Sequence, residues 1–129
     1  MIIIERLQEI SFAVSNLDKS VSFYKDIFGF DIVEWQGGSK EVRMQMGDIN
    51  LRLCEVDNYS VSEESENYLT FYVDDDDFDD AVDEIEENEI ATVFGPENIR
   101  NGPENTKNGR KVVILDPDGN RLGLTTINR

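Results

Sequence analysis

The hydrophobic pattern of the first half predicts a strand, a helix and three further strands. Polar and apolar side chains alternate along residues 8–14, which is typical of a half-buried strand. Asn16 then offers an N-cap, apolar residues recur at helical spacing as far as Phe28, and Gly29 offers a C-terminal stop. Further strands are predicted at about 30–36, 41–47 and 49–56. The first half therefore predicts a β-α-β-β-β block.

The second half repeats this pattern. A polar stretch, 58–67, precedes the alternating residues 68–73, and the acidic residues 74–77 suit the positive end of a second helix. Strands are predicted near 90–95, 110–116 and 120–127, and Asp118-Gly119 is expected to form a hairpin turn. Corresponding strand positions in the two halves lie about 59 residues apart, which indicates an internal repeat. The chain is therefore expected to adopt an α+β fold of two similar halves.

One segment departs from the repeat. Residues 96–109 are rich in Gly, Pro and Asn, and the segment is longer than a hairpin connection needs. Long loops of this kind often act as lids, and a plain surface insertion has the same composition. The sequence leaves both interpretations open.

Charge narrows the range of partners. The chain has 129 residues, which suits one domain, and its 28 acidic against 12 basic residues give a net charge of −16. A field of this sign repels phosphates, so we expect neither nucleic acid nor an anionic membrane as a partner. It favours neutral or cationic small molecules, although solubility alone also explains an acidic surface.

Cysteine content and hydropathy indicate the compartment. Cys54 is the single cysteine, so no intrachain disulfide is possible, as is usual in a reducing compartment. The sequence has no long apolar run and no cleavage-site pattern near its start, so we expect no signal peptide and no membrane span. The expected location is the cytoplasm.

Three short strings carry a resemblance to a known superfamily. They are VSNLDKSVSFY at 14–24, YKDIFGF at 24–30 and DPDGNRL at 116–122. Together with the repeat they resemble the vicinal oxygen chelate superfamily, which includes glyoxalase I, extradiol dioxygenases, fosfomycin-resistance proteins and bleomycin-binding proteins. The resemblance implies a single domain, 1–129, whose two βαβββ modules, about 5–57 and 66–127, form a cup-shaped mixed sheet. It also implies a homodimer.

The same resemblance gives positions for metal ligands on the first and last strands of each module. They fall on Glu9, Arg52, Tyr68 and Gly123. A borderline-soft divalent ion prefers imidazole, thiolate or several carboxylates, and the chain has no histidine. At about 4 Å a fixed guanidinium would repel a unit charge by about 4 kcal/mol at an effective dielectric of 20. We therefore predict no metal and no other cofactor.

Strand alternation indicates which side chains face the cup. They form a mixed polar and aromatic set: Glu9, Ser11, Arg52, Cys54, Tyr68, Thr70, Tyr72 and Arg121, with Trp35 at the mouth. Such a face suits a small molecule with polar handles and a flat body. Three simpler interpretations stay open: Glu9 and Arg52 form an ion pair across the sheet, Trp35 is a core or dimer contact, and Cys54 is a small packed side chain.

The acidic run 74–77 has a similar simple explanation. It lacks the loop spacing, central glycine and distal glutamate of an EF-hand calcium site. A solvated helix start is the preferred interpretation.

These observations rank three functions. The first is a metal-independent binding protein without catalysis, similar to the bleomycin-binding members, that sequesters a cationic or aromatic compound. The second is a metal-dependent lyase or oxidoreductase of the glyoxalase or dioxygenase kind. The third is a regulatory or scaffold dimer with a vestigial cavity. No catalytic residue is assigned.

Overall fold

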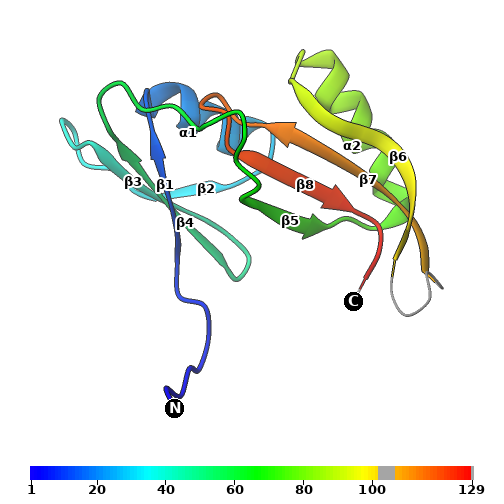
Figure 1. Ribbon diagram of the computed structural model, residues 1–129. Helices are drawn as coiled ribbons and strands as arrows, with labels where there is room; N and C mark the ends of the chain where they lie inside the picture. The colour runs from blue at the N-terminus through cyan, green and yellow to red at the C-terminus, as the bar shows by residue number, and fades with distance from the viewer. Residues whose placement is uncertain (102–106, 129) are drawn as a thin grey trace. The chain divides into compact units, whose positions relative to one another are not determined.

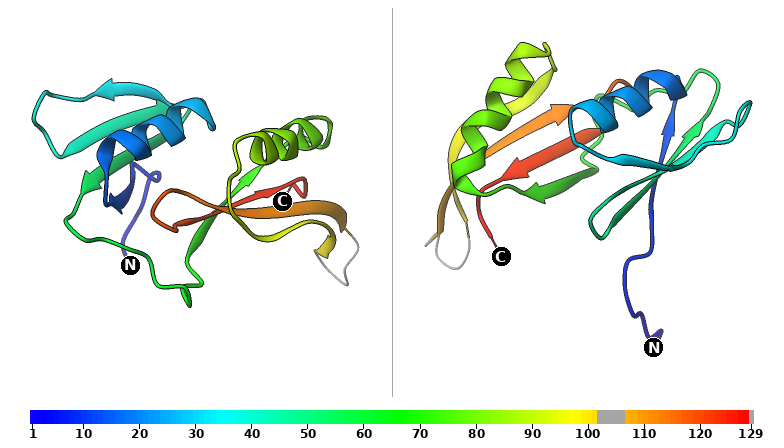
Figure 2. Two further views of the ribbon diagram at one scale, coloured as in Figure 1. Left: turned by 90° about the horizontal axis from the view of Figure 1, so that it is seen from above. Right: turned by 180° about the vertical axis from the view of Figure 1, so that it is seen from behind.

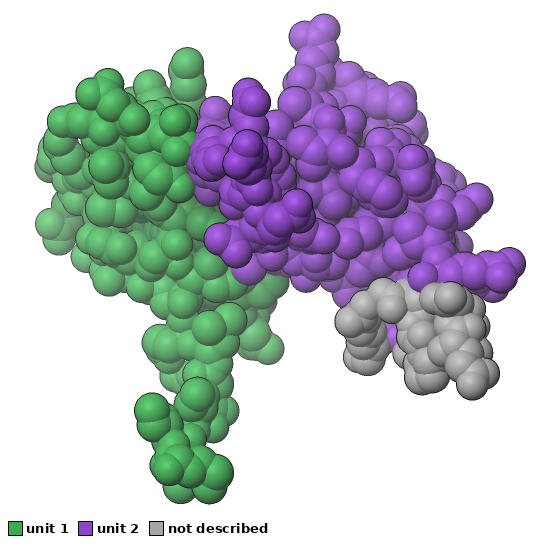
Figure 3. All heavy atoms as spheres, viewed as in Figure 1, with its two compact units in different colours: residues 1–60 green, residues 61–129 purple. Residues whose placement is uncertain are grey.

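The computed structural model of the protein describes residues 1–101 and 107–128, with residue 101 and residue 107 described by backbone alone. The chain divides into two compact units, Met1–Ser60 and Val61–Arg129, which Figure 3 colours separately. Each unit contains one helix and one four-stranded sheet of mixed strand direction. The α+β class and the repeated βαβββ order are therefore confirmed.

Unit 1 has the predicted order of elements (Figure 1). They are β1 (Ile10–Val14), α1 (Leu17–Asp26), β2 (Asp31–Glu34), β3 (Glu41–Met46) and β4 (Ile49–Glu55). The sheet order is β1-β4-β3-β2, with β1 parallel to β4 and the other pairs antiparallel. Helix α1 lies along one face of this sheet and leaves the other face open (Figure 2).

Two side chains fix the start of α1. The Asn16 side chain accepts a hydrogen bond from the Lys19 amide at 3.0 Å, as expected of an N-cap. From the end of β4, Glu55 accepts a hydrogen bond from the Leu17 amide, also at 3.0 Å. Both acceptors satisfy amides that the first helical turn leaves without a partner, so α1 is tied to the sheet that it covers.

The core of unit 1 lies between α1 and the sheet. Its fully buried members include Val14, Tyr24, Phe30, Val42 and Leu53. The ring of Tyr24 stacks on Phe12 and meets Phe30 edge-on, both with centroids about 6 Å apart. Because these apolar side chains all point toward α1, the polar residues that alternate with them point to the open face.

Unit 2 repeats the arrangement. Its elements are β5 (Tyr68–Tyr72), α2 (Asp75–Glu87), β6 (Thr92–Asn101), β7 (Lys107–Leu115) and β8 (Arg121–Thr125). The sheet order is β5-β8-β7-β6, with β5 parallel to β8. Asp74 caps α2, so the acidic run does form a helix start. The buried core of this unit includes Phe78, Ile85, Val112, Ile114 and Leu122.

The hairpin between β7 and β8 is held by one buried carboxylate. Asp116 is 4% exposed, and its Oδ1 accepts hydrogen bonds from the amides of Asp118 at 2.9 Å and Asn120 at 2.8 Å. Its Oδ2 accepts from the Asn120 side chain at 2.8 Å. Gly119 has a φ of 87°, which L side chains rarely adopt. The predicted Asp118-Gly119 turn is confirmed, and its chemistry explains the DPDGN string.

The segment 96–109 differs from the loop that the sequence predicts. Strands β6 and β7 pair through most of it, from Glu97↔Lys111 to residues 101 and 107 at the tip. Gly95 and Pro96, at the start of this segment, lie at a bulge in β6, an edge strand that tolerates them. Gly95 has a φ of 70°, and a Cβ there would clash with the carbonyl of Lys111. Residues 102–106, at the centre of the expected lid, lie outside the described residues.

Two other expectations concern the chain as a whole. No helix in the described part of the chain is long and apolar enough to span a membrane. The single domain 1–129 and the cup stay predictions.

Candidate functional site

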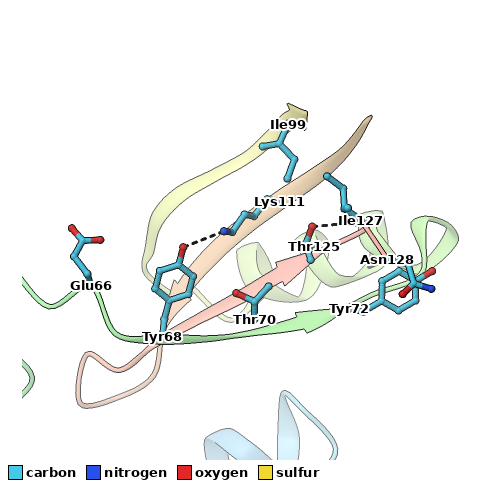
Figure 4. Close-up of a pocket in the computed structure, with 9 residues that line it drawn as sticks. All are labelled: Glu66, Tyr68, Thr70, Tyr72, Ile99, Lys111, Thr125, Ile127 and Asn128. Carbon is cyan, nitrogen blue, oxygen red and sulfur yellow. Dashed lines mark hydrogen bonds between the residues drawn. The ribbon is translucent and has the colours of Figure 1, made fainter. Parts of the chain in front are cut away.

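The open face of the unit 2 sheet carries a pocket of about 640 Å³. Residues of β5, β7 and β8 line it, on the face opposite α2: Tyr68, Thr70, Tyr72, Lys111 and Thr125 (Figure 4). Glu66 lies at one end, and Ile99, Ile127 and Asn128 complete the lining. Because β5 alternates, Tyr68, Thr70 and Tyr72 share this face, as predicted, whereas Leu69 and Phe71 face the core. The structure therefore brings three of the predicted residues into one pocket.

Lys111 is the charged residue on the sheet face of this pocket that the sequence interpretation missed. Its Nζ donates a hydrogen bond to the Tyr68 hydroxyl at 3.1 Å and lies 5.0 Å from the centroid of the Tyr68 ring. Its neighbour Arg110 points to the other face, where it contacts α2. The alternation of β7 could have found Lys111, since it lies opposite Thr125 in the pairing with β8.

One position of the sheet beside the pocket residue Thr70 has no side chain. Gly123 of β8 lies between Thr70 of β5 and Val113 of β7 in the sheet register. A Cβ at Gly123 would lie 3.0 Å from the Thr70 Oγ1, tighter than ordinary contact. The absence of a side chain at Gly123 leaves room for the hydroxyl of Thr70.

Arg121 contacts the backbone of the loop that precedes β5. It lies on the pocket face at the start of β8, opposite Tyr68. Its guanidinium donates to the carbonyl of Glu63 at 2.7 Å and reaches the carbonyl of Ser62 at 3.5 Å. Arg121 therefore holds the loop that precedes β5, and it is not among the residues that line the pocket.

The open face of unit 1 carries an ion-pair network instead of the simple Glu9–Arg52 pair. Arg43 Nε lies 3.1 Å from Glu9 Oε2, and Arg43 also contacts Glu41 at 3.2 Å. Arg52 donates to both carboxylate oxygens of Glu41, at 3.0 and 3.1 Å. Glu9 and Arg52 therefore belong to one network, but each pairs with a residue of β3 that the sequence interpretation did not select.

The network shifts the ionisation of its members. The hydrogen bond from Arg52 lowers the pKa of Glu41 below its usual 4.5, and the charges of Arg52 and Arg43 act in the same direction. In return, the hydrogen bond to Glu41 raises the pKa of Arg52. Both changes stabilise the charged forms, so the two carboxylates and two guanidinium groups neutralise one another.

Three further predicted residues lie in unit 1. Ser11 is opposite Arg52 in the pairing of β1 with β4, and Cys54, a free half-buried thiol, is on the same face of β4 as Arg52. Trp35 is 37% exposed and lines a separate pocket of about 310 Å³ beside the start of α1. The structure does not bring Trp35 into a pocket with the other predicted residues. The ligand-binding roles of the predicted set stay predictions.

Comparison with known proteins identifies the family. The model of the Glyoxalase/Bleomycin resistance protein/Dioxygenase superfamily matches residues 6–124. The chain belongs to this superfamily. Its resemblance to the vicinal oxygen chelate proteins is thereby confirmed.

Individual proteins of the superfamily give a more detailed comparison than the family model. The metallothiol transferase FosB of Staphylococcus epidermidis is 31% identical over 125 residues, 95% of this chain and 84% of that protein. FosB of Staphylococcus haemolyticus (strain JCSC1435) matches with the same identity and coverage. The fosfomycin resistance protein FosX from Mesorhizobium loti superposes with a TM-score of 0.79 at 23% identity, covering 98% of this chain and 95% of that one. FosX from Listeria monocytogenes superposes with 0.82 at 20% identity, covering 98% and 94%. These structures confirm the glyoxalase/bleomycin-resistance fold.

The comparisons correct the functional ranking. A metal-independent binding protein without catalysis was placed first, and that ranking is wrong, because the relatives that match nearly the whole chain are named as transferases. They favour the metal-dependent enzyme, the second of the three functions.

The metal in the relatives' name can be tested against the donors of this chain. At the superfamily's ligand positions unit 1 offers Glu9, whose carboxylate pairs with Arg43, and unit 2 offers a phenol at Tyr68 and no side chain at Gly123. Among the described residues no group of three His, Cys, Asp or Glu side chains could hold an ion. This donor set does not fit a divalent metal.

Proposed function

We propose that the chain is an enzyme of the fosfomycin-resistance kind, which adds a nucleophile such as a thiol to a small electrophilic molecule. The observation that carries this proposal is the 31% identity to a metallothiol transferase along 95% of the chain. Fosfomycin is a small phosphonate with an epoxide ring. In the proposed reaction a sulfur–carbon bond forms, one carbon–oxygen bond of the ring breaks, and the released oxygen takes a proton.

The pocket of unit 2 is the proposed substrate site. Its volume of about 640 Å³ lies within the usual range of about 300–1,000 Å³ for small-molecule sites. Lys111, Tyr68 and Thr70 provide polar groups that can orient a substrate, and the exposed ring of Tyr72 provides an apolar wall. A polar face with two tyrosines supports a compact polar substrate.

The proposal extends to the state of the protein in the cell. We propose a homodimer, which the superfamily resemblance implies, and a cytoplasmic location, which the single free cysteine favours. Light scattering on the purified chain checks the dimer.

Turnover of fosfomycin tests the function. The purified chain is incubated with fosfomycin and with cysteine, glutathione or water as the nucleophile, and phosphorus NMR follows the phosphonate. Each reaction is run with EDTA and with added magnesium, manganese or zinc. We expect a new phosphonate signal that grows with enzyme concentration, and the metal arms show whether an ion is required.

A matched pair of variants links the activity to the pocket. Tyr68→Phe removes one hydroxyl from the pocket and should slow the reaction, whereas Tyr59→Phe removes the same group from a loop of unit 1 and should not. A chain that forms no product with any nucleophile and metal would overturn the proposed function.

A further inference from the structure

Two positions of the unit 2 sheet correspond to metal-ligand positions of the superfamily, and neither offers a good metal ligand. Gly123 has no side chain, and a Cβ there would lie 3.0 Å from Thr70 Oγ1, so a ligating side chain could begin at Gly123 only if Thr70 moved. Tyr68 has an oxygen, but a phenol is a strong ligand only after it loses its proton. The relatives are named metallothiol transferases. In this chain, the chemistry that a metal would supply therefore has to come from another group.

The ammonium of Lys111 lies where it opposes a metal ion on Tyr68. Its Nζ is 3.1 Å from the Tyr68 hydroxyl oxygen. A divalent ion bonded to that oxygen at about 2 Å would lie within about 5 Å of the ammonium. Two positive charges at this separation repel each other, and they do so more strongly in a partly buried site than in bulk water. The hydrogen bond from Lys111 and an ion on Tyr68 therefore exclude each other.

The same hydrogen bond leaves the Tyr68 hydroxyl proton available. An ammonium can only donate, so the Tyr68 oxygen is the acceptor and its own proton points away from Lys111. Among the described residues no other group hydrogen-bonds to this hydroxyl, and the side chain lines the pocket (Figure 4). Tyr68 is 41% exposed, so water can return a proton that the phenol gives up. The pair therefore presents a proton donor, with a positive charge beside it, to a molecule in the pocket.

We propose that this pair takes the place of the metal in the relatives' name: Tyr68 is the general acid of the proposed reaction, Lys111 positions it, and no divalent ion takes part. The inference rests on the proposed function and identifies the group that protonates the released oxygen. A thiol loses its proton to water, its sulfur bonds to one ring carbon, and the carbon–oxygen bond breaks. The released oxygen takes the Tyr68 proton, the ammonium of Lys111 stabilises the phenolate that forms, and water then returns the proton.

Manganese binding tests the exclusion of a metal independently of activity. Mn²⁺ is titrated into the full-length chain, and electron paramagnetic resonance measures the ion that stays free in solution. The titration is run at about 0.15 M salt, which screens weak binding to the acidic surface. We expect the free signal to follow the added concentration. The loss of one equivalent of Mn²⁺ from the free pool would contradict the proposal.

Kinetics of variants test the roles of the two residues. Tyr68→Phe should lower kcat at least about 100-fold and change KM little, because a general acid contributes about 10²–10⁴ to the rate and acts in the chemical step. Lys111→Met should lower kcat by a smaller factor, and Lys111→Arg, which keeps the charge, should recover most of that loss. The matched controls Tyr59→Phe and Lys19→Met remove the same groups from unit 1 and should keep the wild-type kcat. Circular dichroism shows that each variant is folded.

The outcomes separate this inference from the proposed function. Turnover of fosfomycin that persists in EDTA and depends on Tyr68 supports both. Turnover that EDTA abolishes and a divalent ion restores, or a Tyr68→Phe variant that changes only KM, would overturn the replacement of the metal and leave the proposed function intact. A chain that converts fosfomycin with none of the nucleophiles refutes the proposed function and the role of Tyr68 together, and the manganese titration then decides by itself whether unit 2 excludes an ion.

Discussion

Replacing Asp116 tests whether one buried carboxylate holds the β7–β8 hairpin. Asp116→Ala leaves the amides of Asp118 and Asn120 without their acceptor at 2.9 and 2.8 Å. A buried donor without a partner costs about 1–3 kcal/mol, so we expect the free energy of unfolding to fall by about 2–4 kcal/mol, with some repair by water. For a chain of this size that corresponds to a melting temperature lower by roughly 8–15 °C.

A conservative replacement of Asp116 should lower the free energy of unfolding by less. Asp116→Asn keeps an oxygen in the place of Oδ1 and so keeps both amide contacts. It puts an amide nitrogen opposite the side-chain nitrogen of Asn120, where two donors meet instead of a donor and an acceptor. We expect this variant to lose only about 0.5–1.5 kcal/mol.

Urea unfolding followed by far-ultraviolet circular dichroism measures these differences. Asp48→Ala is the matched control, because it removes the same side chain from the exposed turn between β3 and β4. It should change the free energy of unfolding by less than about 0.5 kcal/mol. The argument from hydrogen bonds is refuted if Asp116→Ala is as stable as this control, or if Asp116→Asn loses as much as Asp116→Ala.

Two further predictions concern ion pairs. Glu41→Gln should destabilise unit 1 at pH 7 and less at about pH 3, because the lowered pKa of Glu41 contributes stability that is fully present above 4.5 and is lost as the pH falls through the lowered pKa. Urea unfolding at both pH values checks this, and an equal effect at both contradicts it. Arg110→Met should speed amide hydrogen exchange in α2 and not in α1, because the Arg110 guanidinium binds the carboxylates of Asp75 and Asp79 at 3.1 and 2.6 Å and so ties α2 to β7. Unchanged exchange in α2 would show that the core contacts alone hold the helix.

Much of the fold can be predicted from the sequence because the patterns that specify strands and helices are local. The alternation around Phe12 and the capping group of Asn16 predict β1 and the start of α1, and the structure has both. The prediction was wrong from Pro96 onward, where the composition predicts a loop that begins just after the strand at 90–95. In the structure Pro96 lies at a bulge in β6, and the pairing of the following residues with β7 outweighs their local preference.

The site was less predictable because it depends on which strands are neighbours. Tyr68, Thr70 and Tyr72 follow from alternation on one strand. Lys111 and Glu41 lie on strands whose register with their partners is set by long-range pairing, so the sequence alone did not place them beside Tyr68 and Arg52.

The internal repeat gives the chain two copies of one open sheet face, and they differ in electrostatic balance. In unit 1 two acids and two guanidinium groups satisfy each other on that face. In unit 2 the corresponding face has a lysine held by a phenol. The two copies of one scaffold can therefore serve different ends. In unit 1 the charged side chains stabilise the sheet itself, whereas in unit 2 the lysine charge stays available to a ligand.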